Sequence, residues 1–148
     1  MAAATGAPAT PDPHAELLVL GAGPGGYTAA FRAADLGRKV VLVDRSPVLG
    51  GVCLNVGCIP SKAFLHVAKV IEDSRDMGAH GVTFGAPQID LGLIRDWKEQ
   101  VVQKLTGGLQ TLARQRNVRV VTGYARFHSP DAVEVMAAIS GWRYDTSD

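Results

Sequence analysis

The sequence lacks a continuous apolar run of the roughly 20 residues that a membrane-spanning helix needs. It also lacks a strong charge of either sign, because its formal net charge is +1 at pH 7. Its first residues have no basic start before an apolar core, and they contain no arginine. We therefore expect no membrane and no nucleic acid among its partners, no signal or transit peptide, and a cytoplasmic location.

Histidine and cysteine are also scarce, with four and two residues respectively in a chain of 148. A structural zinc site requires about four ligands, and only His66 stands near the two cysteines in the sequence. We therefore expect no metal site. Two cysteines are also too few for a framework of structural disulfides, and in a reducing compartment such a pair is more often catalytic or metal-binding.

What the first half of the chain does contain is the pattern of a βαβ unit. Residues 16–20 form a short apolar run, and residues 39–44 form a second one that is rich in β-branched side chains. Between them, residues 27–36 are rich in alanine and end at Gly37, which is typical of a helix with a glycine stop. This order predicts two parallel strands joined by a right-handed helical crossover, and hence an α/β fold of the Rossmann type.

The rest of the chain is predicted to extend this one domain. Residues 1–14 are rich in Ala, Pro and Thr, so we interpret them as a flexible tail or linker, and we assign residues 15–148 to the domain. The further predicted elements are a helix over 63–77, a short strand at 82–84, a long amphipathic helix over 91–112 with Asp90 as its N-cap, a strand at 118–122, and a small β-ribbon formed by 124–127 and 132–135 around a turn at 129–131.

A GxGxxG motif, Gly21, Gly23 and Gly26, lies between the first predicted strand and the helix. In such a motif the first glycine makes a tight turn, the second lets the backbone approach a pyrophosphate, and the third lets the helix pack closely on the strand. Asp44 ends the second strand, where a carboxylate can accept hydrogen bonds from a ribose diol. The pattern predicts a dinucleotide site and does not say which dinucleotide binds.

Both cysteines, Cys53 and Cys58, lie in the stretch GGVCLNVGCIPSK at residues 50–62. Inside a regular helix their Cα atoms would stand about 8–9 Å apart, whereas a disulfide requires roughly 4.4–6.8 Å. Either the segment is irregular at Gly57, or the two cysteines are not bridged. Pro60 suits the first turn of a following helix, whose dipole would stabilise a thiolate at Cys58. We favour a disulfide that opens and closes; the alternatives are a zinc site, a structural disulfide and two unrelated thiols.

Two stretches, GAGPGGYTAAFRAADLG at residues 21–37 and GGVCLNVGCIPSK at residues 50–62, resemble the pyridine nucleotide-disulfide oxidoreductases and, within that family, the dihydrolipoamide dehydrogenases. The resemblance extends over residues 15–135. It implies that the domain binds FAD, and that the complete enzyme oxidises dihydrolipoyl groups of a 2-oxoacid dehydrogenase complex with NAD as the final acceptor. Glutathione and mercuric reductases share the CxxxxC plan, so a related disulfide reductase is an alternative.

The same resemblance assigns roles to individual residues. Cys53 would be the thiol that exchanges with the substrate, and Cys58 would face the flavin and pass electrons to it. The family more often has glutamate at the position of Asp44, whose side chain is one methylene shorter. The residues implied to contact FAD are Gly21, Gly23 and Gly26 at the pyrophosphate, Asp44 at the adenosine ribose, Arg45, Gly51, Val52 and Cys53 along the cofactor, Lys62 at the reactive edge of the flavin, and Gly123 and Ala125 at the adenine.

The resemblance also implies parts that this sequence does not contain. There is no second GxGxxG motif for NAD and no dimerisation domain, and none of the four histidines has the motif of the family's C-terminal His-Glu pair around it. We therefore interpret the chain as a truncated portion of an enzyme that acts as a homodimer on a lipoyl-bearing acyltransferase. The alternative is a stand-alone flavin-binding or redox module.

Overall fold

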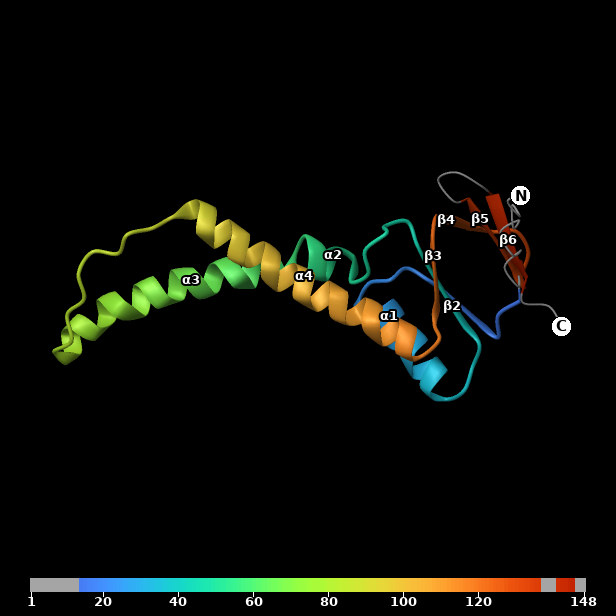
Figure 1. Ribbon diagram of the computed structural model, residues 1–148, viewed down its shortest axis with the longest axis horizontal. Helices are drawn as coiled ribbons and strands as arrows, with labels where there is room; N and C mark the ends of the chain where they lie inside the picture. The colour runs from blue at the N-terminus through green and yellow to red at the C-terminus, as the bar shows by residue number, and fades with distance from the viewer. Residues whose placement is uncertain (1–13, 137–140, 146–148) are drawn as a thin grey trace, which may run out of the picture.

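A parallel sheet organises the part of the chain that the computed structural model describes, which is residues 14–136 and 141–145 (Figure 1). The tail predicted at residues 1–14 lies outside the described residues except for His14. Strands β1 (Leu17–Leu20), β2 (Val40–Asp44) and β3 (Arg119–Thr122) pair in the order β1-β2-β3. Helix α1 (Pro24–Asp35) connects β1 to β2, so the predicted βαβ unit is confirmed and β2 is the central strand.

Strand β2 is buried on both of its faces because alternate side chains enter two different apolar clusters. Leu42 packs in one cluster with Phe31 of α1. Val43 packs on the opposite face with Val135 of the second sheet. Such two-sided burial explains why this strand reads as a continuous apolar run, and each buried side chain contributes about 1.5–3 kcal/mol of transfer free energy.

The second sheet is antiparallel and covers one face of the parallel sheet. Strands β4 (Tyr124–Phe127) and β5 (Ala132–Met136) confirm the predicted β-ribbon, with Ala125 aligned to Val135. A third strand, β6 (Gly141–Asp145), pairs with β5 and was not predicted. The sequence shows only a short apolar–polar alternation there, and it is the backbone of β5 that supplies the pairing partner.

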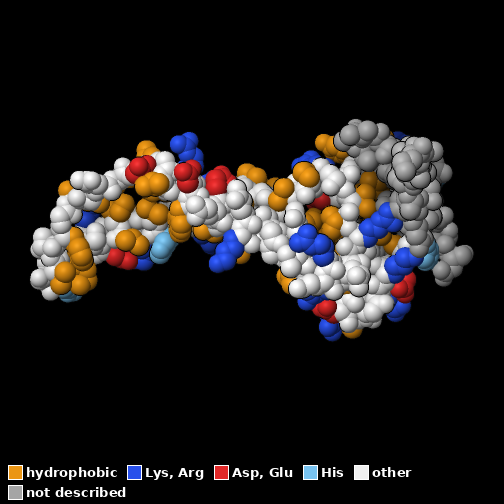
Figure 2. All heavy atoms as spheres, in the orientation of Figure 1, with side chains coloured by type: hydrophobic (Ala, Val, Ile, Leu, Met, Phe, Trp, Pro, Cys, Tyr) orange, Lys and Arg blue, Asp and Glu red, His pale blue; other side chains and the backbone are white. Residues whose placement is uncertain are grey.

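Four helical segments lie between β2 and β3. Two of them, α3 and α4, pack against each other and extend away from the sheets; we call residues 58–115 the helical hairpin (Figure 1). Few of its side chains are buried, and apolar side chains appear along its surface (Figure 2). The segments are α2 (Gly51–Asn55), α3 (Cys58–Asp76), the 3₁₀ turn η1 (Met77–His80) and α4 (Leu91–Gln115).

The hairpin confirms one sequence prediction and corrects another. Asp90 caps α4 as predicted, because its Oδ1 accepts hydrogen bonds from the amides of Gly92 at 2.8 Å and Leu93 at 3.0 Å. The strand predicted at 82–84 was wrong, since residues 82–90 have no regular structure. Val82 and Phe84 are exposed, and no strand among the described residues lies alongside to pair with them.

The stretch Gly51–His80 meets the length and mean hydropathy of a membrane-spanning helix, with a mean hydropathy of 1.2 over its best window. By length and composition, therefore, one segment does reach the values of a membrane span, although the sequence contains no continuous apolar run of that length. It is not a clear membrane span, because the stretch consists of separate elements, α2, α3 and η1, with a break between Asn55 and Cys58.

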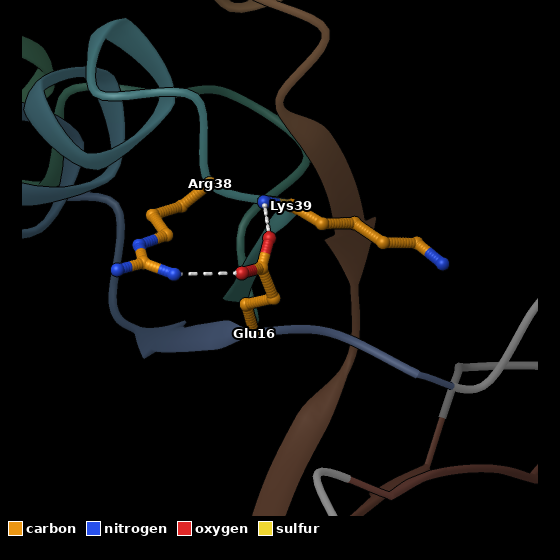
Figure 3. A network of polar contacts seen from close by, with 3 residues as sticks. All are labelled: Glu16, Arg38 and Lys39. Carbon is orange, nitrogen blue, oxygen red and sulfur yellow. Dashed lines mark hydrogen bonds and ion pairs between the residues drawn. The ribbon is translucent and has the colours of Figure 1, made fainter. Parts of the chain in front are cut away.

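At the amino end of the parallel sheet, Glu16 joins β1 to the loop that precedes β2 (Figure 3). Its Oε2 accepts the Lys39 amide at 2.7 Å, and its Oε1 accepts from the Arg38 guanidinium at 2.9 Å. The bond from the Lys39 amide lowers the pKa of the Glu16 carboxyl most, and the bond from the Arg38 guanidinium lowers this pKa further. The carboxylate therefore fixes the register of two chain segments at this end.

Candidate nucleotide and redox site

The glycine turn is built so that only glycine fits at two of its positions. Gly21 has φ +96° and donates its amide to the Val43 carbonyl at 2.7 Å, which closes the turn on β2. A Cβ atom at Gly26 would lie 1.7 Å from the Gly21 carbonyl oxygen. A Cβ atom at Gly23 would meet nothing within 4 Å. The side of the turn at Gly23 therefore remains open to a ligand.

Helix α1 begins directly at this open side. Its N-cap is Gly23, no side chain caps its first amides, and Pro24 follows as its first residue. Uncapped amides and the helix dipole together favour an anionic group such as a pyrophosphate. The open turn and the helix start have the geometry that the GxGxxG motif predicted, and their contact with a pyrophosphate stays a prediction.

Asp44 stands at the carboxyl end of β2, between the turn and the next loop. Its Oδ2 accepts the Ala22 amide at 2.5 Å, and its Oδ1 accepts the Ser46 amide at 2.7 Å. The sequence predicted a ribose ligand at this position. In the structure the carboxylate already holds two backbone segments, although each oxygen retains a further lone pair.

Two cavities adjoin Asp44 and Arg45. One, of about 260 Å³, contains Asp44 and four other residues that were predicted to contact the cofactor. The other, of about 230 Å³, continues toward the cysteine segment. The first is lined by Leu20, Gly21, Val43, Asp44, Arg45, Gly123, Tyr124 and Ala125, and the second by Asp44, Arg45, Ser46, Gly51, Val52, Asn55 and Val56.

The two cysteines lie on either side of a break between helices. Cys53 is half-buried in α2, and Cys58, the first residue of α3, is exposed. The Val52 carbonyl accepts the amides of both Val56 at 2.9 Å and Gly57 at 2.7 Å, which ends α2. The segment is therefore irregular, as a bond between the two cysteines would require, and both thiols are free in this structure.

The electrostatics of the pair are asymmetric. The pKa of the Cys53 thiol is raised, first by a hydrogen bond with Cys58, then by partial burial and by the charge of Cys58. The Lys62 ammonium acts in the opposite direction on the same pKa. The structure thus brings Cys53, Cys58 and Lys62 into one electrostatic cluster, in which Cys53 retains its proton more strongly than an isolated thiol.

Asn55 belongs to this site, and the sequence reasoning missed it. Its Nδ2 donates to the carbonyls of Leu49 at 3.1 Å and Gly51 at 2.9 Å, which fastens the end of α2 to its beginning. The sequence offered one signal for this role, a carboxamide side chain between two cysteines in an otherwise apolar stretch. In the structure this side chain is partly buried, and buried polar groups need hydrogen-bond partners.

Direct backbone contact joins the glycine turn to the cysteine segment. The Gly50 amide donates to the Ala22 carbonyl at 2.9 Å. A Cβ atom at Gly51 would lie 2.7 Å from the Gly23 Cα atom, so the two segments can approach this closely only with glycine at position 51. The glycine motif and the cysteine motif, separate in the sequence, therefore form one site.

The sequence profile of the pyridine nucleotide-disulphide oxidoreductases matches residues 15–145. The chain is 61% identical over 121 residues to a dihydrolipoyl dehydrogenase of Vibrio parahaemolyticus and 57% identical over 121 residues to that of Vibrio cholerae, covering 82% of this chain and 26% of each relative. It is 59% identical over 112 residues to the dihydrolipoyl dehydrogenase of Haemophilus influenzae, covering 76% and 23%. The chain spans about a quarter of the length of these curated relatives.

Proposed function

Because the chain belongs to the pyridine nucleotide-disulphide oxidoreductase family, we propose that it forms the FAD-binding and redox-disulfide portion of a dihydrolipoyl dehydrogenase. One observation carries this proposal: the Gly50 amide bonds the Ala22 carbonyl, so a dinucleotide cradle and a cysteine pair share a single backbone junction. An α/β domain that bound a nucleotide only would have no need of a cysteine pair at that junction.

The residues present fit FAD. The open turn at Gly23 and the uncapped start of α1 suit its pyrophosphate. The cavity beside Gly21, Gly123 and Ala125 suits its adenosine, and the cavity beside Gly51 and Val52 suits the part that continues toward the cysteines. When bound, FAD supplies the capacity to accept an electron pair from the cysteine dithiol, for later delivery to NAD.

The cysteines perform thiol–disulfide exchange with a dihydrolipoyl dithiol. One substrate thiolate attacks the Cys53 sulfur, the Cys53–Cys58 bond breaks, and Cys58 leaves as a thiolate. The second substrate thiol then attacks the mixed disulfide, which closes the oxidised lipoyl ring and releases Cys53. The substrate loses two electrons and the protein disulfide gains them.

The location of the negative charge follows from the surroundings of the two sulfurs. The raised pKa of Cys53 keeps the proton there in the dithiol state. Cys58 sits at the first residue of the 19-residue helix α3, where the helix dipole stabilises an anion. Lys62 adds a cation one turn further along α3. This division of roles supports Cys53 as the exchanging thiol and Cys58 as the sulfur that transfers electrons.

The partners follow from the same proposal. The name of the curated relatives, dihydrolipoyl dehydrogenase, supports a dihydrolipoyl group as the substrate. We propose that the acyltransferase of a 2-oxoacid dehydrogenase complex carries this group. The complete enzyme is a cytoplasmic homodimer with NAD as co-substrate. These assignments concern the longer protein of which this chain would be a portion.

The visible absorbance spectrum of the purified 148-residue chain tests the proposal. We expect a flavin spectrum that gains a long-wavelength band after mild dithiol reduction. Cys58→Ser should abolish this band, whereas Cys53→Ser should keep the flavin bound and block thiol exchange. A chain that stays colourless when supplied with FAD, or a band that persists in Cys58→Ser, would contradict the proposal.

A further inference from the structure

Asp44 is placed where three segments of the chain meet. Its two oxygens accept the amides of Ala22, in the glycine turn, and Ser46, in the loop after β2. A carboxylate that accepts two backbone amides forms charge-assisted hydrogen bonds, which are about twice as strong as neutral ones. Loss of the bond to Ala22 would weaken the attachment of the turn to β2, which the bond from the Gly21 amide to the Val43 carbonyl also holds.

The Ala22 peptide extends this link to the cysteine segment. Its amide donates to Asp44, and the carbonyl of the same residue accepts the Gly50 amide at 2.9 Å. Gly50 is the N-cap of α2, which carries Cys53. A continuous line of hydrogen bonds therefore runs from the Asp44 carboxylate through Ala22 to the beginning of the cysteine helix.

The close approach of the two loops makes this line sensitive to the position of the turn. Gly51 is in contact with Gly23, at a distance that leaves no space for a Cβ atom. A shift of the glycine turn would therefore move the start of α2. Because Asn55 fastens the end of α2 to Leu49 and Gly51, the short helix would move as a unit.

We propose that Asp44 is a positioning residue that couples the nucleotide turn to the cysteine helix. The proposal rests on the proposed function, in which Cys53 and Cys58 form a reversible disulfide, and it gives Asp44 a task besides contact with a ribose. The side chain, one methylene shorter than glutamate, keeps the carboxylate close to the backbone amides. Asp44 thereby fixes the start of the helix that carries Cys53, and with it the position from which Cys53 reaches Cys58.

Hydrogen exchange in the unmodified chain is the first test, and it needs neither flavin nor a disulfide. We expect the amides of Ala22, Ser46 and Gly50 to open as one cooperative unit, with a common opening free energy across a series of low denaturant concentrations. Independent opening of the Gly50 amide would overturn the proposal. This measurement stands even if variants at Asp44 fail to fold.

The second test compares Asp44→Asn with Glu16→Gln. Both variants replace a carboxylate that accepts a backbone amide, at opposite ends of the same sheet. The carboxamide introduced by Asp44→Asn can accept one amide only and presents a donor to the other. We expect exchange at Gly50 to rise about tenfold in Asp44→Asn, the order expected for one lost charge-assisted bond, and less than about twofold in Glu16→Gln.

The disulfide equilibrium is measured in the same variants against glutathione. Oxidised glutathione accepts two electrons, the S–S bond forms between Cys53 and Cys58, and two glutathione thiols leave with the two thiol protons. We expect the equilibrium constant for disulfide formation to fall about tenfold in Asp44→Asn and to stay constant in Glu16→Gln. An unchanged constant in Asp44→Asn, or an equal fall in both variants, would overturn the coupling.

Failure of this inference can be told apart from failure of the proposed function. If the unmodified chain binds no FAD, or its cysteines form no disulfide, the proposed function fails, and the exchange data alone decide whether Asp44 holds Gly50. If flavin binding and the disulfide are normal while Gly50 is insensitive to Asp44, only the positioning role is lost.

Discussion

Leu42 in the central strand is fully buried, whereas Leu65 on α3 keeps 65% of its surface exposed. The two leucines represent two regions that are stabilised differently. The parallel sheet gains its stability from side chains packed on both faces of β2. The helical hairpin relies on local helix interactions, such as the Asp90 cap and the ion pair between Lys69 and Asp73. Substitutions should therefore be costly in the first region and mild in the second.

The largest effect is expected at Gly26, where the sheet region tolerates no side chain. Gly26→Ala would place a methyl group against the Gly21 carbonyl, which is backbone and cannot move aside. We expect the free energy of unfolding to fall by about 4 kcal/mol or more. Gly25→Ala is the matched control, since a Cβ atom there meets nothing within 4 Å. Urea unfolding of both variants measures the difference, and equal losses would contradict the clash.

The next prediction compares the same side-chain truncation, leucine to alanine, in the two regions. Leu42→Ala leaves a cavity in the cluster around Phe31, and we expect a loss of about 3 kcal/mol of unfolding free energy. Leu65→Ala removes the same atoms from an exposed position of α3, and we expect a change within about 0.5 kcal/mol. Similar losses at both positions, measured by urea unfolding, would show that the hairpin is packed as tightly as the sheet.

The smallest effect has the opposite sign and lies in the hairpin. Gly107 is inside α4, and a Cβ atom there would meet nothing within 4 Å. Gly107→Ala should therefore stabilise α4 by up to about 1 kcal/mol, because alanine loses less backbone entropy in a helix. Amide exchange across α4 measures this gain. Faster exchange in the variant would reveal a packing role for Gly107.

The success of sequence reasoning followed a different division, between features that depend on local chemistry and features that depend on a distant partner. The βαβ unit, the Asp90 cap and the glycine turn were predicted because each depends on local chemistry that the residues display directly. The strand predicted at 82–84 was wrong because a strand also needs a partner, which short apolar runs do not specify. Strand β6 was not predicted, because its own sequence is a weak signal and its pairing with β5 stabilises it.

The site shows the same limit at the level of single residues. Cys53 and Cys58 could be singled out from their spacing, and the structure places them on either side of the break between α2 and α3, where Cys58 raises the pKa of the Cys53 thiol. The bond between Gly50 and Ala22 could not be predicted, because it is formed by backbone atoms of two loops that are distant in the sequence. The bond from the Ala22 amide to Asp44 was hidden for the same reason.

The position of β3 beside β2 has a consequence for the order of folding. β1, α1 and β2 are contiguous, so their pairing closes only a short loop. β3 pairs with β2 although residues 45–118 separate the two strands in the sequence. The pairing must therefore overcome the entropy cost of closing a long loop. Early pairing of α3 with α4 would lower this entropy cost, because the paired helices bring the two ends of the loop closer together. The hairpin would then act as a kinetic aid to the sheet, and helix-stabilising changes at its surface would accelerate the arrival of β3.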